Sequence, residues 1–512
     1  MSIPTIFSQN RLMLAGIVIA VFHGSVIDVR AAEAGRPENQ SSAPPETAVE
    51  QLQDTVTALQ AEVAILKAQV AQMQAATANS DQANRSLSHD LVDLAPQGAA
   101  GDPAQGAQEG PSSVVGTPKD ATLSAEDRAI LNYFKTSTIN VLVDGYYEYN
   151  FNNPIGRVNL LRAYDVSSNA FSLNQAAVVF ERAADPEAGR RWGTRLDLQF
   201  GQATATLQGN PANEHRPDIY RNIFQAYGTY VLPVGSGLNV DFGKWASSLG
   251  YEGNYTKDQM NYSRSYWFNF LPFYHEGFRI RYQVNSEFGL NYWVINGNNQ
   301  TEPTNGFKDE MFGFVVTPNK KLTWTTNYYF GQENPDAAPA TGCGPIPVQP
   351  GLCFTQITPA PDGKLNIFDS YVNWQATSKW TFALEGDYVI QRIWADAAPG
   401  KNSAPAHTWG GAGYAQYQLT PNQYLAARGE YLGDYGSYFT GGLFSGVSEA
   451  LKEVTLTYTY NVVDGLQVKT EWRRDWSNVP IFLTSTQNIY SKDQNTATLG
   501  LIWWFGRKQG AW

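Results

Sequence analysis

Charged residues and cysteine are scarce in this chain. Asp, Glu, Lys and Arg make up 16% of its 512 residues, and only two cysteines and five histidines are present. Two cysteines without a nearby histidine are a poor basis for a metal site, so we expect neither a metal nor a cofactor. The net charge is −11, which argues against nucleic acid as a partner and favours cations over anions.

Long apolar runs are also scarce. The most marked one, residues 12–22, follows Arg11 and is too short to cross a bilayer as a helix. Small residues follow at Ala31 and Ala32, and this pattern predicts a secretory signal peptide over residues 1–32. We therefore expect an exported chain without a helical membrane anchor.

The C-terminal two-thirds of the sequence alternates between short polar turns and long connections, joined by segments of about ten residues. This alternation is typical of an outer-membrane β-barrel, with tight periplasmic turns and long external loops. A soluble sandwich has no reason to place its short connections at one end. The short turns are residues 183–190, 233–237, 285–286, 317–321, 376–379, 420–423 and 462–465, and the long connections are residues 151–170, 201–220, 250–276, 297–309, 331–364, 395–408, 434–449 and 477–495.

The joining segments alternate apolar and polar residues. In residues 466–475, Leu466 and Trp472 fall on one face, whereas Lys469 and Glu471 fall on the other. A strand in lipid needs an apolar outer face, and charges on its other face need water. A half-exposed sheet in a soluble protein alternates in the same way, but the strand count, the loop asymmetry and the aromatic content favour the barrel.

Aromatic residues make up 13% of the chain, and several Tyr and Trp occur at segment ends. Such rings suit the interface between lipid and water. Eight long and seven short connections join sixteen segments. We therefore predict an all-β transmembrane antiparallel barrel of about 16 strands over residues 137–512, in contact with lipid in the bacterial outer membrane.

A different pattern precedes the barrel. In residues 47–75, apolar residues follow a spacing of three and four without a break, which predicts a periplasmic coiled coil. A single amphipathic helix packed on another surface is the alternative, but the narrow apolar seam favours the coiled coil. Residues 76–121 are rich in Ala, Gly, Gln, Ser and Pro and are expected to form a flexible linker. Ser124 can cap a short helix within residues 122–136, either inside the barrel mouth or beneath it.

The two cysteines, Cys343 and Cys353, lie in one predicted external loop. The exported compartment oxidises thiols, so we expect a local disulfide between them. A ring this small would stabilise the protein by about 3 kcal/mol at most.

No arrangement of residues indicates catalysis. The sequence has no G-x-S-x-G, H-E-x-x-H, P-loop or dinucleotide-binding motif. After the signal peptide, His89 lies in the linker, and His215, His275 and His407 lie in predicted loops without a serine at a workable spacing. We therefore predict that the protein is not an enzyme.

Charges of both signs recur at the inward positions of the predicted strands. In a water-filled barrel such charges orient polar solutes and select ions, although they can also pair only for stability. The candidate pore-lining residues are Arg195, Asp197, Arg279, Arg281, Glu385, Asp387, Arg428, Glu430, Lys469, Glu471 and Arg473.

The long connection of residues 250–276 is rich in aromatic residues. So many exposed rings would be a liability unless they pack against something. We expect this loop to fold into the lumen and narrow it, with Lys257, Asp258 and Arg264 as candidate constriction residues and Arg264 or Lys257 facing the solute. The alternative is a loop that packs outside, at the rim or against another subunit.

Several short motifs resemble the OmpL-like family of β-barrel porins. They are DGYYEYNFNNP at residues 144–154, RAYD at 162–165, FSLNQ at 171–175, GKWASSLGYE at 243–252, NYSRS at 261–265 and PFYHEGFR at 272–279. The resemblance covers residues 122–505 and implies an outer-membrane channel. It brings no catalytic residues with it.

We therefore predict a porin for passive diffusion of small hydrophilic solutes or ions, assembled as a homo-oligomer, either a trimer or a dimer. The alternative function is structural. In that case the barrel conducts little and anchors the envelope, through contact between its coiled coil and the cell wall.

Replacing Leu59 and Leu66 with Asp is expected to leave the barrel folded and to weaken association, because carboxylates would enter the apolar seam. Native electrophoresis measures the change. Ala61→Asp with Ala68→Asp is the matched control, because both positions lie opposite the seam. An unchanged oligomer in the leucine variant, or after deletion of residues 33–121, would show that the coiled coil does not set the assembly.

Overall fold

The computed structural model describes residues 124–506, apart from residues 208–213, 215, 339–357, 360–362, 393, 396–397, 403 and 436–447. The predicted signal peptide, coiled coil and linker lie outside the described residues, as does the predicted disulfide between Cys343 and Cys353. Within the described part of the chain, no helix is long and apolar enough to span a membrane.

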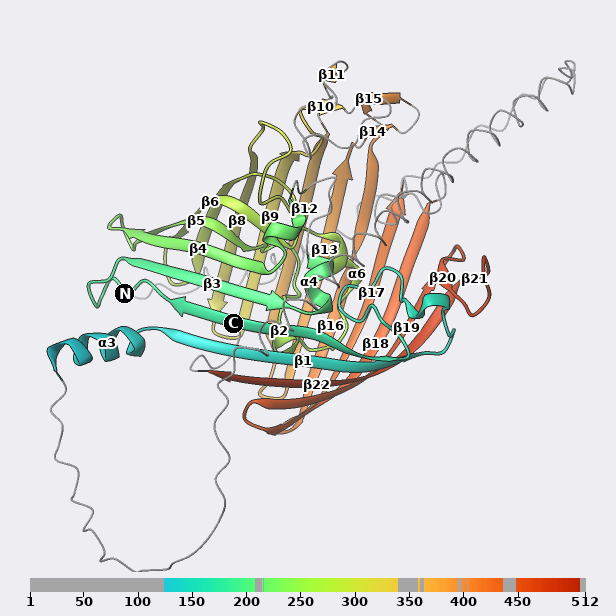
Figure 1. Ribbon diagram of the computed structural model, residues 1–512, viewed down its shortest axis with the longest axis horizontal. Helices are drawn as coiled ribbons and strands as arrows, with labels where there is room; N and C mark the ends of the chain where they lie inside the picture. Colours follow the sequence, from blue (N-terminus) through green and yellow to red (C-terminus); the bar gives the residue numbers. More distant parts are fainter. Residues whose placement is uncertain are drawn as a thin grey trace, which may run out of the picture. The chain divides into compact units, whose positions relative to one another are not determined.

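Sixteen antiparallel strands form a closed barrel, which confirms the predicted fold and strand number (Figure 1). The barrel closes because β1 pairs with β22, with Tyr147 opposite Leu499. In order around the barrel the strands are β1 (Thr138–Asn150), β2 (Ala170–Arg182), β3 (Trp192–Phe200), β4 (Ile223–Leu232), β5 (Leu238–Ala246), β6 (Tyr274–Gln283), β7 (Phe288–Ile295), β8 (Asp309–Asn319), β9 (Leu322–Gln332), β12 (Lys364–Gln375), β13 (Trp380–Gln391), β16 (Ala406–Thr420), β17 (Gln423–Tyr435), β18 (Glu449–Val463), β19 (Leu466–Ser477) and β22 (Asp493–Gly506).

The short and long connections alternate around the barrel as predicted. The turn between β18 and β19 consists of Asp464 and Gly465, and Gly465 has φ 84°; a two-residue hairpin turn requires such a conformation. The long connections contain all the remaining short elements after β1. These are η1 (Ile155–Arg157), α4 (Gln202–Leu207), α5 (Pro217–Tyr220), η2 (Thr256–Asp258), α6 (Tyr266–Phe270), and the strand pairs β10 (Ala337–Ala338) with β11 (Thr358–Pro359), β14 (Trp394–Ala395) with β15 (Ala398–Asn402), and β20 (Phe482–Leu483) with β21 (Tyr490–Ser491).

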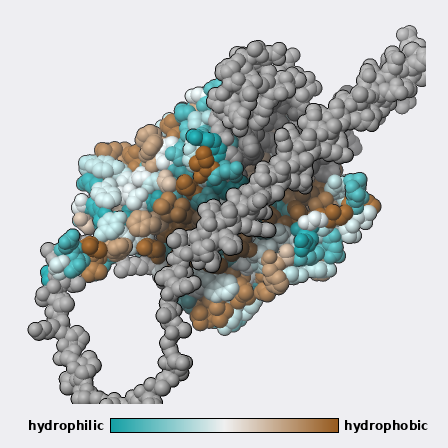
Figure 2. All heavy atoms as spheres, in the orientation of Figure 1, coloured by the Kyte–Doolittle hydropathy of each residue, from teal (hydrophilic) through white to brown (hydrophobic). Residues whose placement is uncertain are grey.

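Each strand separates an apolar outer face from a polar inner face. In β19, Trp472 is exposed on the outside, whereas Lys469, Glu471 and Arg473 are buried inside the barrel. Hydrophobic residues gather on the visible wall near β1 and β22, and hydrophilic residues are more frequent at its two ends (Figure 2). This distribution matches a wall that faces lipid and encloses polar groups.

Helix α3 (Ala125–Lys135) precedes the barrel. Ser124 and Asp127 form the expected capping box at its first turn. The Arg182 guanidinium, at the end of β2, lies 4.6 Å from the Tyr133 ring and 4.8 Å from the outward-facing Trp192 ring. Because its described side chains are exposed, α3 lies beside the wall at the end that carries the short turns and does not fill the barrel mouth.

Candidate functional site

The connection between β5 and β6, residues 247–273, lies inside the barrel; we call it loop L3. In the barrel order β17 lies eight positions from β5, so the two strands are on opposite walls. The backbone N–H groups of Tyr266 and Trp267 in L3 nevertheless donate to Glu430 on β17, at 2.9 and 2.8 Å. Loop L3 therefore crosses the lumen to the opposite wall.

Inward-facing carboxylates hold the backbone of L3. Six of its N–H groups donate to four carboxylates on four strands, and hydrogen bonds to a charged acceptor are stronger than neutral ones. Besides the two bonds to Glu430, the pairs are Gly250 with Asp369 at 3.1 Å, Tyr251 with Glu385 at 3.1 Å, and Tyr262 and Ser263 with Glu471 at 2.6 and 3.0 Å.

Inward-facing cations bind the carbonyl groups of the same loop. The Lys469 ammonium donates to the carbonyl oxygens of Thr256 at 3.0 Å and Gln259. Arg473 donates to the Arg264 carbonyl at 2.6 Å, and Arg428 donates to the Ser263 carbonyl at 2.8 Å. A buried backbone group without a partner is costly, so charges of both signs on the wall make the inward path of L3 possible.

A continuous chain of ion pairs runs inside the barrel along the neighbouring strands β17, β18 and β19. Its seven members alternate in sign, and their side chains are almost fully buried. In order they are Glu252, Arg428, Glu453, Arg473, Asp475, Arg162 and Asp165. The N–O distances of the first five links are 2.8, 2.7, 3.6, 2.8 and 2.6 Å in the same order. The sixth link is the pair of Arg162 with Asp165.

The outer ends of this chain come from two loops. Glu252 belongs to L3, and Arg162 and Asp165 belong to the connection between β1 and β2. Burial alone would lower the pKa of Arg162, but the Asp165 and Asp475 carboxylates outweigh it and raise that pKa well above its usual value. The guanidinium therefore stays charged and fixes the connection between β1 and β2 to Asp475 on the wall.

Tyrosine hydroxyls add three further bonds between L3 and the wall. Tyr255 donates to Asp197 on β3 at 2.9 Å, Tyr262 to Asp144 on β1 at 2.9 Å, and Tyr266 to Asp475 on β19 at 2.8 Å. Burial, and then the Asp144 carboxylate, raise the pKa of Tyr262 well above its usual value, so its hydroxyl remains a donor.

The Tyr262 ring lies where Gly500 on β22 leaves space. A Cβ atom at Gly500 would collide with that ring. The absence of a side chain at this position therefore lets an aromatic residue of L3 approach the wall closely.

The aromatic side of L3 packs into an apolar cluster. Trp267 and Leu271 are buried with Trp245 and Trp293 from the wall, and the cluster continues to Leu432 on β17. This packing shields from water the apolar surface that so many aromatic rings would otherwise expose.

Most of the predicted pore-lining residues contact L3 rather than open lumen. Glu385, Arg428, Glu430, Lys469, Glu471 and Arg473 all bond to it directly. Asp197 accepts from Tyr255 of L3 and from Arg195 at 2.9 Å, and Asp387 lies beside Glu385 and Asp369.

Arg279 and Arg281 are placed differently. They pair with Asp241 at 2.8 and 3.0 Å, on the wall formed by β5 and β6. The Arg281 side chain is 48% exposed, so it remains accessible to water.

The two cations among the predicted constriction residues are buried and bind groups of L3 itself. Arg264 is 1% exposed and donates to the carbonyl groups of Gly253, Tyr262 and Asn254 within its own loop. Lys257 pairs with Asp258 at 2.6 Å, and its side chain is largely buried. Neither cation is placed as the sequence led us to expect, because both bind groups of L3 itself, and whether either one meets a solute stays a prediction.

Several residues of this site were not among the candidates. We did not select Asp144, Arg162, Asp165, Glu252 or Asp475 from the sequence as pore-lining or constriction residues. All except Asp475 lie in short motifs already noted there: DGYYEYNFNNP, RAYD and GKWASSLGYE. Their position in these motifs was the feature of the sequence that could have identified them as site residues.

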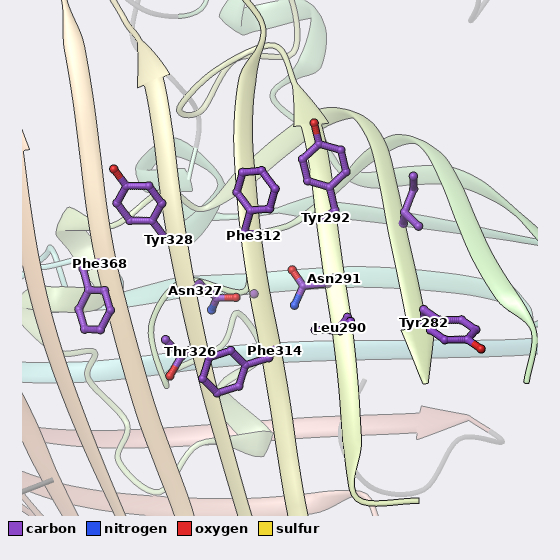
Figure 3. Close-up of a pocket in the computed structure, with 12 residues that line it drawn as sticks. Tyr282, Leu290, Asn291, Tyr292, Phe312, Phe314, Thr326, Asn327, Tyr328 and Phe368 are labelled. Atoms are coloured by element: carbon purple, nitrogen blue, oxygen red, sulfur yellow. The ribbon is translucent and has the colours of Figure 1, made fainter. Parts of the chain in front are cut away.

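A separate groove lies on the outer wall, across β7, β8, β9 and β12 (Figure 3). Outward-facing rings line it, among them Tyr292, Phe312, Phe314, Tyr328 and Phe368. Its position and apolar lining place it on the lipid-facing surface, so it does not belong to the interior site.

Comparison with known proteins gave three findings. A family profile described as "Putative beta-barrel porin-2, OmpL-like" matches residues 136–505. None of the curated proteins matches the sequence. Similar solved structures include the outer membrane channel DcaP of Acinetobacter baumannii, at 10% identity and TM-score 0.47, which covers 72% of this chain and 97% of DcaP.

Two further structures have comparable scores. An anion-selective porin from Comamonas acidovorans is 8% identical with TM-score 0.44, and the match covers 72% of this chain and 99% of that porin. OprB of Pseudomonas putida is 13% identical with TM-score 0.42, and the match covers 74% of this chain and 96% of OprB.

Asp475→Asn is expected to lower the free energy of unfolding by about 3 kcal/mol, because it removes a buried partner from Arg162 and Arg473. The loss falls at the lower end of the usual range because each arginine keeps one other carboxylate. Urea unfolding in detergent measures it. The control is Asp493→Asn, which breaks the exposed pair with Arg474 and should cost about 1 kcal/mol or less. Equal losses in the two variants would contradict a stabilising role for the buried chain.

Proposed function

The chain belongs to the family of OmpL-like β-barrel porins, and from this premise we propose that it forms a channel for passive diffusion of small hydrophilic solutes or ions. A barrel of this family resides in the bacterial outer membrane. A sixteen-strand wall with polar inner faces supports the proposal, since a barrel of about this size encloses an aqueous passage. Family membership points to a channel rather than to an enzyme.

The crossing of the lumen by L3 is the observation that carries the proposal furthest. A loop that spans from β5 and β6 to Glu430 on β17 divides the interior. The proposed passage is therefore narrower than the barrel itself. Because charged side chains and not apolar contacts alone hold L3, its position is defined and the passage keeps a fixed size.

The charges that meet a solute are a smaller set than the sequence indicated. Arg281, with its exposed side chain, is the best supported; it shares its partner Asp241 with the more buried Arg279. Charges buried under L3 act on the solute only at longer range. We propose that Arg281 contributes to ion selectivity at the end of the barrel near the short turns.

The proposal also covers assembly of the chain into an oligomer and, as the alternative function, anchoring of the envelope. The heptad segment of residues 47–75 favours a homo-oligomer, as a trimer or dimer. A barrel that anchors the envelope to the cell wall through this segment and conducts little is the alternative function. Conductance in a planar bilayer separates the two.

Deleting residues 254–269 is expected to raise single-channel conductance clearly, because the part of L3 that reaches β17 and β19 is removed. Planar-bilayer recording measures it, with heat-dependent electrophoretic mobility and circular dichroism to establish that the barrel is folded. A folded deletion variant with unchanged conductance would place the conducting path away from L3. If neither protein conducts, the anchoring function is favoured.

Arg281→Gln is expected to shift the reversal potential in a salt gradient toward cations, because one accessible positive charge leaves the lumen. Asp241 keeps Arg279 as its partner, so the fold should be retained. The control is Arg474→Gln, an exposed arginine outside the lumen that pairs with Asp493. Equal reversal potentials for Arg281→Gln and the unaltered protein would exclude Arg281 from the ion path.

A further inference from the structure

Three carboxylates inside the barrel form a compact group at the start of L3. They belong to Asp369 on β12 and to Glu385 and Asp387 on β13. One oxygen from each residue can be chosen so that all three lie within 4.8 Å of one another, and all three residues are buried. We propose that these carboxylates bind a divalent cation, with Ca²⁺ as the best match.

The spacing suits one shared ion. Ca²⁺ binds oxygen ligands at about 2.3–2.6 Å, so two ligands on opposite sides of it are about 5 Å apart. Calcium also accepts irregular arrangements of six to eight oxygens. Mg²⁺ demands a regular octahedron at about 2.0–2.1 Å, which two carboxylates of one strand and one of its neighbour match less well.

Strand pairing forces these carboxylates together. Asp369 stands directly opposite Asp387 in the pairing of β12 with β13, and Glu385 is the previous inward residue of β13. Like charges directly opposite each other on neighbouring strands are destabilising. A cation between them would convert this repulsion into attraction.

Asp387 gives the second observation, because no Lys, Arg or neutral donor of the described residues binds its carboxylate. Asp369 accepts from Gly250 N–H at 3.1 Å and from the Asn327 side chain at 2.8 Å. Glu385 accepts from Tyr251 N–H at 3.1 Å and from the Tyr414 hydroxyl at 3.2 Å. Asp387 is 5% exposed, yet neither of its carboxylate oxygens has a hydrogen-bond partner among the described residues.

No positive side chain balances the group. Within the described part of the chain, none of the Lys or Arg ion pairs involves these three carboxylates. This differs from the chain of ion pairs at Arg428, where each carboxylate has an arginine. A buried negative charge without a counter-charge is strongly unfavourable, and a bound cation is one way to neutralise it. The other way is a proton shared by Asp369 and Asp387, and the titration with CaCl₂ distinguishes this proton from a bound cation.

A cation here would also fix L3. Asp369 and Glu385 hold the first residues of the loop, Gly250 and Tyr251, through their backbone N–H groups. With the ion in place, both carboxylates stay ionised and keep these bonds. The proposal concerns ion binding alone and does not depend on whether the barrel conducts.

The test uses the full mature chain, refolded from inclusion bodies in detergent so that lipopolysaccharide carries no ions into the sample. After treatment with EDTA and its removal, isothermal titration with CaCl₂ is expected to give one bound Ca²⁺ per chain. Asp387→Asn should weaken binding by roughly tenfold or more, because a charged ligand is lost. Asp241→Asn is the matched control, an inward carboxylate with arginine partners, and should leave Ca²⁺ binding unchanged.

Terbium luminescence gives a second readout. Tb³⁺ replaces Ca²⁺, and tyrosines next to the group would sensitise it, such as Tyr414, whose hydroxyl donates to Glu385, and Tyr251, whose backbone N–H donates to the same carboxylate. The site is supported if Ca²⁺ displaces the Tb³⁺ signal in the unaltered protein and in Asp241→Asn, and if Asp387→Asn shows no such displaceable signal. Should Asp387→Asn fail to fold, Glu385→Gln replaces it with the same expectation. An unaltered protein that binds no Ca²⁺ overturns the proposal in favour of the shared proton. An Asp387→Asn variant that binds Ca²⁺ as tightly as the unaltered protein also overturns it, because the ion would then lie elsewhere.

Discussion

Binding of the L3 backbone by charged side chains of the inner wall is the interaction on which the interior of this barrel depends. A loop that enters a barrel loses water from its N–H and C=O groups, and each lost partner must be replaced. Here Glu430, Glu471, Glu385 and Asp369 replace water on the donor side, and Lys469, Arg428 and Arg473 replace it on the acceptor side. Without these charges the loop would be better solvated outside the barrel.

The same charges must also balance one another. Alternation of sign from Glu252 through Arg428 and on to Asp165 leaves each member with at least one opposite neighbour. Removal of one member of such a buried network is costly because the remaining charge stays buried. The network therefore fixes L3 and the connection between β1 and β2 as one unit, and any solute path has to pass beside that unit.

The sequence was sufficient to predict the barrel, its sixteen strands and the inward side of strands such as β19. Those features follow from the exposure of single residues to lipid or water, which a period of two records directly. The aromatic residues of L3 indicated that the loop packs against something, but they left open whether it packs inside the barrel or outside it. The partners inside the barrel could not be predicted, because they depend on pairing between distant strands. Arg428 and Glu252 bond across 176 residues.

Asp369 illustrates the same limit. It lies in β12 between Phe368 and Ser370 without a charged neighbour in the sequence. Only the register that places it opposite Asp387 brings three carboxylates together. The burial of Arg264 could not be predicted for a related reason. Its charge was evident, but the carbonyl groups that bury it come from the folded path of its own loop.

Hydrogen exchange of the L3 backbone tests the central claim most directly. The amides of Gly250, Tyr251, Tyr262, Ser263, Tyr266 and Trp267 donate to wall carboxylates, whereas residues 485–488 in the connection between β19 and β22 are exposed. Exchange measured by mass spectrometry on the detergent-solubilised barrel should be much slower in the L3 peptides than in those that contain residues 485–488. Equal, fast exchange in both would contradict a loop held inside the barrel by charges of the wall.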